Sequence, residues 1–169
     1  MKLKYQELIP AEFHPESRVW IYQSSRLFTL QEALAIEDQI NQFVASWKTH
    51  GAQVKAYGNL LFGQFIVLIA DETQATVSGC STDSSVRFIK EIERQFNVTM
   101  FDRQMLAFLI NDRVQVLPLS QVGPALELGK LTSDTLYFNN LVLTKQALID
   151  SWIVPISQSW LSTRFLKKQ

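Results

Sequence analysis

The stretch FIVLIAD, residues 65–71, places six apolar residues in succession before Asp71. A run of this length cannot span a bilayer, and it has no polar face, which is typical of a strand that is covered on both sides. Residues 53–62 also resemble a strand, and Gly63-Gln64 between the two stretches predicts a tight turn. We therefore expect a β-hairpin whose second strand lies at the centre of a sheet.

The residues before this hairpin predict a strand and a helix. Residues 18–24 alternate apolar and polar side chains, as a half-buried strand does. TLQE, residues 29–32, is a capping-box pattern, and Gly51 suits the end of the helix that this box begins. The predicted helix covers roughly residues 29–49, and its apolar residues recur at steps of three and four: Leu30, Ala33, Ile36, Ile40, Phe43, Val44 and Trp47.

The residues after the hairpin predict a second helix and a second hairpin. Val86, Ile89, Ile92 and Phe96 indicate an amphipathic helix over roughly 83–96. MLAFLIN and RVQVLPL are strand-like and are joined at Asn111-Asp112, a typical hairpin turn. Further along the chain we expect a short helix at 120–128, a strand at 135–138 and a helix at 144–151.

The element order β-α-β-β-α-β-β predicts an α+β fold, an antiparallel sheet with two main helices on one face. The first six elements match the split βαβ of a ferredoxin-like sandwich. We expect one domain over residues 1–169, with an irregular arm at 1–16 that contains Pro10 and Pro15. Residues 118–169, helical and rich in tryptophan, should pack on this domain as an extension.

Composition narrows the function classes. The chain has 169 residues, 47% of them hydrophobic, and 16 basic residues balance 16 acidic ones. Without a basic excess, general nucleic-acid binding is not expected, and no apolar run predicts membrane insertion. A single cysteine is typical of a reducing compartment, and the first residues lack the apolar core of a signal peptide, so we expect a cytoplasmic protein.

Two fragments resemble parts of a nucleotide-hydrolysing site. GNLLFGQF, residues 58–65, has the glycine spacing of a Walker A loop, but Gln64 and Phe65 replace the lysine and the hydroxyl residue that bind phosphate and magnesium. IVLIADE, residues 66–72, resembles a Walker B strand. The first fragment leads into a strand rather than a helix, so nucleotide hydrolysis is the least favoured function.

Five fragments together resemble a known family. They are SRVWIYQSSRLFT (17–29), SGCSTDSSVRFIKEIE (78–93), FDR (101–103), LYFNNLV (136–142) and SWLSTRF (159–165). Their combination is similar to a family of small uncharacterised bacterial proteins, whose members are often labelled "ABC transporter ATPase". The resemblance extends over nearly the whole chain from residue 17, and it implies no catalytic residues.

The segment VSGCSTDSSVRF, residues 77–88, contains the only cysteine. Cys80 precedes the predicted helix 83–96, and a helix N-terminus favours a thiolate. A nucleophilic cysteine also needs a base, and His14 and His50 are the only histidines. Cys80 is therefore a candidate nucleophile of a small thiol-dependent enzyme, although a buried packing cysteine is the favoured interpretation.

The same segment is a candidate site for a small anion or a phosphate. Hydroxyl and amide groups surround the expected helix start, with an arginine one turn later. The tentative ligand residues are Ser78, Gly79, Cys80, Ser81, Thr82, Ser84, Ser85 and Arg87. The simpler alternative is that Thr82 or Asp83 caps the helix, and an acidic cap would repel an anion.

Arg18 and Arg26 are the remaining candidate ligand residues. With Trp20, Tyr22 and Ser24 they alternate onto one face of the first strand, where they could bind a flat or anionic ligand. An ordinary exposed sheet face or a partner surface is the favoured alternative.

The sequence therefore predicts a non-enzymatic binding or interaction domain. We expect no cofactor, because no spacing of His, Cys, Asp or Glu indicates a metal site. The expected partners are a small anionic ligand and a second copy of the chain, which would bind through sheet edges or the Trp-rich tail.

Overall fold

The computed structural model describes residues 4–49, 52–73 and 79–166. Its strands are β1 (Arg18–Gln23), β2 (Lys48–Thr49), β3 (Ala52–Gln53), β4 (Lys55–Leu61), β5 (Phe65–Asp71), β6 (Met105–Ile110), β7 (Arg113–Pro118), β8 (Leu136–Phe138) and β9 (Ile153–Pro155). Its α-helices are α1 (Leu30–Ser46), α2 (Gly79–Phe96), α3 (Leu119–Glu127) and α4 (Lys145–Ser151), and short helical turns cover Tyr5–Leu8, Ile156–Gln158 and Ser162–Leu166. The fold is α+β with antiparallel sheets, as predicted.

The first sheet has the order β1-β5-β4, and β5 is its central strand. Every residue of β5 is buried, which confirms the interpretation of the apolar run. Ile66, Leu68 and Ala70 face α1 and α2, and the alternate residues face the opposite side. The predicted turn between β4 and β5 is also present, with Phe62 at φ 55° and Gly63 at φ 62°. Residues 58–65 are therefore a β-hairpin.

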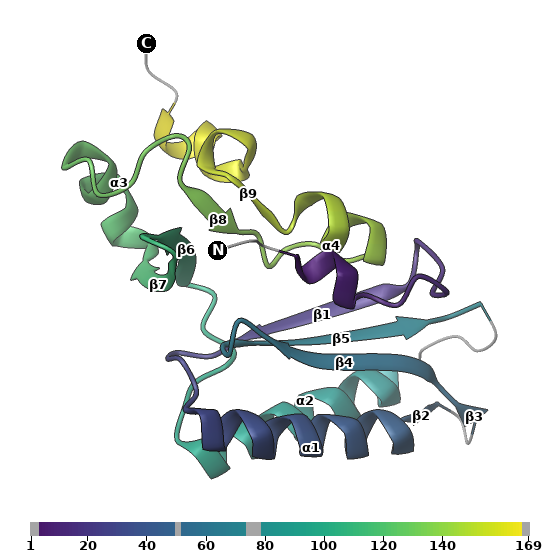
Figure 1. Ribbon diagram of the computed structural model, residues 1–169. Helices are drawn as coiled ribbons and strands as arrows, with labels where there is room; N and C mark the ends of the chain where they lie inside the picture. The colour runs from purple at the N-terminus through teal and green to yellow at the C-terminus, as the bar shows by residue number, and fades with distance from the viewer. Residues whose placement is uncertain (1–3, 50–51, 74–78, 167–169) are drawn as a thin grey trace.

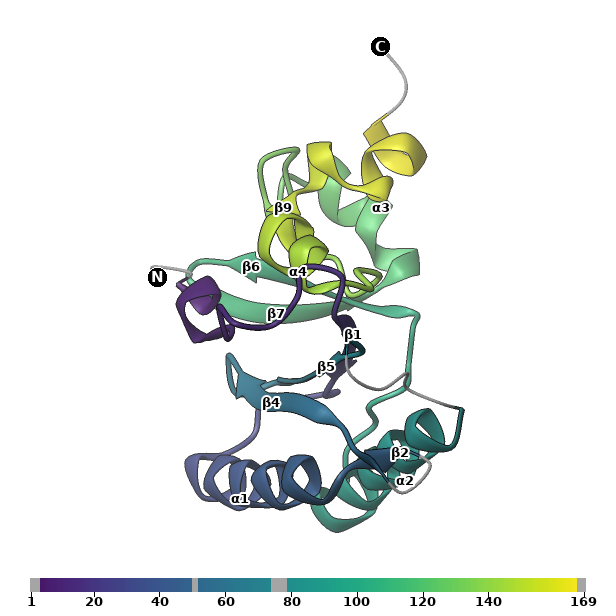
Figure 2. The same ribbon diagram turned by 90° about the vertical axis from the view of Figure 1, so that its right-hand side faces the viewer.

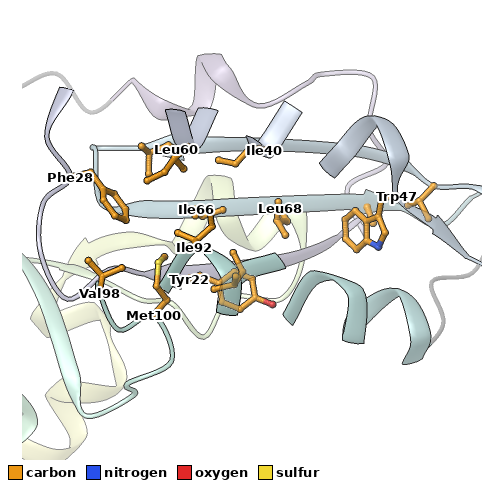
Figure 3. Close-up of a cluster of buried hydrophobic side chains, with 14 residues drawn as sticks. Tyr22, Phe28, Ile40, Trp47, Leu60, Ile66, Leu68, Ile92, Val98 and Met100 are labelled. Atoms are coloured by element: carbon orange, nitrogen blue, oxygen red, sulfur yellow. The ribbon is translucent and has the colours of Figure 1, made fainter. Parts of the chain in front are cut away.

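Both main helices lie on one face of this sheet (Figures 1 and 2). The capping box of α1 is confirmed, because Thr29 accepts from the Glu32 amide and Glu32 accepts from the Thr29 amide. The helix ends at Ser46, before the predicted end at 49, and Leu30 is exposed rather than part of the apolar stripe. A hydrophobic core, which we call the first core, fills the space between the helices and the sheet. Figure 3 shows Ile40 and Leu68 in this core.

A glycine sets the distance between α1 and β4. A Cβ at Gly58 would lie 2.6 Å from Cγ2 of Ile40 and 3.0 Å from Cγ2 of Val44. Real Cβ atoms do not approach other atoms so closely, so the missing side chain lets the helix pack directly on the strand.

The second sheet, β7-β6-β8-β9, is where the structure differs from the predicted single sheet. The β6–β7 hairpin is confirmed, with Asn111 at φ 51° and Asp112 at φ 58°. In a ferredoxin-like sandwich the strand after the second helix would pair with β1. Here the residues before α4 occupy that edge, since the Val19 amide donates to the Leu143 carbonyl at 3.0 Å and Arg18 bridges to Thr144. The ferredoxin-like arrangement is therefore not confirmed.

The extension predicted at 118–169 contributes strands as well as helices. β8 pairs with β6, and β9, which was not predicted, pairs with β8. The second sheet and α4 lie across the first sheet from α1 and α2 (Figure 2). Five rings fill the contact between them, and we call these the closed aromatic cluster: Tyr5, Phe62, Phe65, Phe138 and Trp152.

The described part of the predicted arm, residues 4–16, covers the closed aromatic cluster. Its helical turn places the Tyr5 hydroxyl 2.8 Å from the Leu148 carbonyl of α4. Lys145, a buried residue, donates from Nζ to the carbonyls of Ala11 at 3.2 Å and Phe13 at 2.6 Å. In residues 4–49, 52–73 and 79–166, no helix is both long and apolar enough to cross a membrane.

Candidate functional site

A cavity of about 380 Å³ lies between the end of β1, residues 100–106 and the chain from β8 to α4. Four aromatic side chains line it, and we call them the aromatic wall: Tyr22, Phe101, Tyr137 and Trp160. The Phe101 ring meets Tyr22 edge-on at 5.5 Å, and the Trp160 ring meets Tyr137 edge-on at 6.4 Å between centroids. The volume is in the range of sites that bind small molecules.

Apolar side chains at the cavity are unusually exposed. Phe101, Leu141 and Leu143 all line it, and they are 39%, 61% and 72% exposed. An isolated exposed leucine is ordinary, but apolar residues grouped around one cavity mark a surface that can bury them on binding.

Two amide side chains form a bridge along the cavity. Gln23 Nε2 donates to the Met105 carbonyl at 3.1 Å, and Asn140 Nδ2 donates to Gln23 Oε1 at 2.9 Å. Asn140 Oδ1 in turn accepts from the Trp152 indole at 3.0 Å. This Gln23–Asn140 bridge joins both sheets, and Trp152 connects it to the closed aromatic cluster.

The two tyrosines of the aromatic wall have different partners. The Tyr22 hydroxyl lies 3.3 Å from Ser85 Oγ in α2, whereas the Tyr137 hydroxyl accepts from the Trp160 indole at 3.1 Å. Burial raises the pKa of both tyrosines, and these hydrogen bonds offset only part of that rise. Both phenols are therefore neutral near pH 7.

Asp102 and Arg103 supply the charge beside the cavity, and both are exposed. Asp102 Oδ1 accepts from the Gln104 amide at 2.9 Å. Within the described ranges no ion pair includes Arg103, so its guanidinium is available to a ligand.

The candidate anion segment lies at the start of α2. The helix begins at Gly79, so Thr82 and Asp83 lie inside it and the prediction that one of them caps it is wrong. Ser78 and the side chains of Cys80 and Ser81 lie outside the described residues, so the anion site and the reactive thiol stay predictions. Among the other candidates, Ser84 accepts from the exposed Arg87 at 3.3 Å, and Ser85 contacts the cavity residue Tyr22 and donates to the Thr82 carbonyl.

The two candidate histidines give Cys80 no established base. His50 lies outside the described residues. Nδ1 of His14 accepts from the Glu16 amide at 3.0 Å, and the His14 amide donates to Asp71. The Cys80–histidine pair therefore stays a hypothesis.

Arg18 and Arg26 lie at opposite ends of β1 and do not form one site. Nη1 of Arg18 lies 3.6 Å from Oε1 of Glu72, and Cζ of Arg18 lies 4.8 Å from the centroid of the Trp20 ring. Arg26 pairs through both terminal nitrogens with Glu32, and this pairing, with the Thr29 amide, lowers the pKa of Glu32 to about 2. The strand face between these two arginines is not exposed, because its side chains Trp20 and Tyr22 pack in the first core.

Asp71, the acidic end of the Walker B-like stretch, connects the end of β5 to the N-terminal arm and to β4. Its carboxylate accepts from the Thr73 amide at 2.9 Å, the Thr73 hydroxyl at 2.7 Å and the His14 amide at 3.1 Å, with Lys55 Nζ at 3.5 Å. Burial alone would raise the pKa of Asp71, but these hydrogen bonds and the Lys55 charge outweigh it and hold the pKa well below its usual range.

Sequence reasoning missed the cavity, because its residues are far apart in the chain. Local turn signals at 102–103 and 139–140 gave no sign that these residues would meet. In the described ranges, no three residues of the metal-binding types His, Cys, Asp and Glu lie close enough together to hold an ion.

Compared with protein-family models, curated proteins and solved structures, the chain has no match. The resemblance to the bacterial family labelled "ABC transporter ATPase" therefore stays a prediction.

Proposed function

We propose that this protein binds a small molecule in the cavity between its two sheets, without converting it chemically. The observation that carries the proposal is the cavity of about 380 Å³ with its aromatic wall. Largely apolar pockets with a few placed polar groups are where proteins bind small ligands. The ligand would bury the exposed side chains of Phe101, Leu141 and Leu143.

Binding is favoured over catalysis by the kind of polar group at the cavity. Apart from the exposed Asp102 and Arg103, the polar side chains that line it are amides and neutral phenols, which Gln23, Asn140, Tyr22 and Tyr137 supply. Amides position a ligand by hydrogen bonds, but they do not exchange protons at neutral pH as a general acid or base must.

The sequence-based candidate segment has a supporting role in this proposal. Ser85 holds the hydroxyl of Tyr22, so the start of α2 fixes one ring of the aromatic wall. An anion at residues 78–87, a homodimer and a reactive Cys80 remain separate hypotheses, each open to its own test.

A fragment screen tests the proposal. Ligand-observed NMR with one- and two-ring compounds should find binders, and in amide spectra their shifts should concentrate at residues 21–23, 100–106 and 137–143. Leu141→Trp, at the exposed edge of the cavity, should weaken these binders. Leu128→Trp is the matched control, because Leu128 is a similarly exposed leucine at the C-terminal end of α3 that does not line the cavity. Shifts spread evenly over the protein, or no binders at all, would contradict the proposal.

A further inference from the structure

We propose that the ligand of this cavity is a planar aromatic compound whose polar atoms are hydrogen-bond acceptors, as in a ring-bound carbonyl or carboxylate. The inference rests on the proposed function, because it names the chemistry of the molecule that fills the same site. Its basis is a set of uncommitted hydrogen-bond donors on a wall that is otherwise largely apolar and aromatic.

The orientation of both amides in the Gln23–Asn140 bridge follows from partners that have only one role. The Met105 carbonyl can only accept, so the nitrogen of Gln23 must face it at 3.1 Å. The Trp152 indole can only donate, so the oxygen of Asn140 must face it at 3.0 Å. Each amide nitrogen has two hydrogens and makes one hydrogen bond within the described chain. One N–H of Gln23 and one of Asn140 are therefore uncommitted.

The two hydroxyls of the aromatic wall, those of Tyr22 and Tyr137, differ in whether their own hydrogen is used in a hydrogen bond. Ser85 donates its hydrogen to the Thr82 carbonyl at 2.7 Å, so Tyr22 must be the donor in its contact with Ser85. Tyr137 is the acceptor in its bond with the Trp160 indole, and that indole is the hydroxyl's one hydrogen-bond partner among the described residues. The phenol hydrogen of Tyr137 is therefore free, and burial, which raises the pKa, keeps it in place near neutral pH.

The cavity also carries acceptors. Besides the second carboxylate oxygen of Asp102 and the Tyr22 hydroxyl, these are second lone pairs on oxygens that already accept one hydrogen bond, those of Gln23, Asn140 and Tyr137. The uncommitted donors belong to Gln23, Asn140, Tyr137 and Arg103. A ligand that presents acceptors pairs with these donors, while its flat body makes the edge and offset contacts that aromatic rings favour.

Three naphthalenes of matched shape test the inference. They carry at position 2 a carboxylate, an acetyl group or an isopropyl group, so the first two present acceptors and the third presents none. In titrations followed by NMR, 2-acetylnaphthalene should bind at least three- to tenfold more tightly than 2-isopropylnaphthalene, about the value of one hydrogen bond. Tighter binding of 2-naphthoate than of the ketone, abolished by Arg103→Gln, would assign the preferred acceptor as anionic. Equal binding would assign it as neutral.

Tyr137→Phe removes the free donor and leaves the ring. It should reduce the preference for the ketone to less than about twofold and leave the affinity for the hydrocarbon unchanged. Tyr57→Phe is the matched control, because this half-buried tyrosine in β4 also loses a hydroxyl with one hydrogen-bond partner, Asn59 at 2.9 Å, away from the cavity. Should Tyr137→Phe not fold, the unaltered protein with ¹³Cζ-labelled tyrosine gives the same answer. The Tyr137 signal should then move with the ketone and not with the hydrocarbon.

The outcomes separate this inference from the proposed function. Equal affinity for ketone and hydrocarbon, with shifts at residues 100–106 and 137–143, would overturn the donor inference and leave small-molecule binding in place. An unmoved Tyr137 signal with bound ketone would overturn the inference in the same way. If no compound shifts these residues, both proposals fail.

Discussion

Two neighbouring residues of β8, both largely buried, contribute to different aromatic groups. Phe138 is 1% exposed and stacks on Phe65 at 4.7 Å, inside the closed aromatic cluster. Tyr137, one residue earlier and on the other face of the strand, belongs to the aromatic wall of the cavity. Because side chains alternate along a strand, this three-residue strand supplies one ring to the closed aromatic cluster and one to the aromatic wall.

The difference between these two aromatic groups lies in what covers them. The N-terminal arm and α4 cover the closed aromatic cluster, and Tyr5 itself comes from that arm. The aromatic wall instead borders an open volume with exposed leucines beside it. Rings that are surrounded by protein stabilise the fold. In the aromatic wall, Tyr22 and Tyr137 are largely buried as well, whereas Phe101 and Trp160 keep contact area for a ligand.

The largest expected effect comes from truncating one ring of each group. Phe138→Ala should lower the free energy of unfolding by about 3–5 kcal/mol, because it leaves a cavity among packed rings. Phe101→Ala should lower it by about 1 kcal/mol or less, because that side chain is already 39% exposed and relaxes into solvent. Urea unfolding measures both, and similar losses would show that the two groups contribute alike.

Asp71 tests whether the closed aromatic cluster depends on its cover. Asp71→Asn removes the charge that holds the His14 amide of the arm, so we expect a loss of about 1.5–3 kcal/mol in the free energy of unfolding at pH 7.

The pH dependence of stability provides the second measurement on Asp71. Its folded pKa is depressed, so the stabilisation is complete above the unfolded pKa of about 3.9 and is lost as the pH falls toward the folded pKa. The unaltered protein should therefore lose stability below about pH 4 more steeply than Asp71→Asn. Parallel pH profiles would show that Asp71 contributes nothing through its charge.

Asn140 connects the cavity residue Gln23 to Trp152 of the closed aromatic cluster. Asn140→Ala should cost about 1 kcal/mol of stability, because water can replace one lost partner at this half-buried position. It should also shift the indole N–H signal of Trp152. Asn139→Ala is the control, since that side chain makes one longer bond, to the Leu141 amide at 3.3 Å. An unchanged Trp152 signal would show that the bridge does not connect the groups.

The smallest effect on stability is expected beside the cavity. Leu141→Ala should change the free energy of unfolding by less than about 0.5 kcal/mol and yet weaken 2-acetylnaphthalene several-fold. Leu128→Ala should change neither quantity, although Leu128 is 73% exposed and chemically identical. An equal loss of affinity in both variants would mean that the ligand does not contact Leu141.

Most helices and strands could be predicted, because their signals are local. The capping box at Thr29, the apolar run of β5 and the hairpin at Asn111 are all present as expected. The start of α2 was predicted too late, since hydroxyl residues favour caps in isolation. In the folded chain Ser85 donates to the Thr82 carbonyl and contacts Tyr22, so its hydroxyl is used inside the helix rather than as a cap.

The sheet assignment and the cavity could not be predicted, because both depend on distant contacts. Residues 143–144 occupy the edge of β1, where local patterns place β6, and no pattern near either segment reveals this pairing. The aromatic wall likewise combines positions 22, 101, 137 and 160. In the sequence, Trp160 is only one residue of the Trp-rich tail.

The position of the N-terminal arm has a consequence for how the protein is made. The Tyr5 hydroxyl donates to the carbonyl of Leu148, which is 143 positions later in the chain. The carbonyl of Phe13 accepts from Lys145, which also comes late in the chain. During synthesis the arm emerges before its binding partners, which follow more than 130 residues later. A nascent chain therefore holds one face of the finished β1-β5-β4 sheet uncovered until α4 emerges, which is the interval in which a chaperone would find apolar surface to bind.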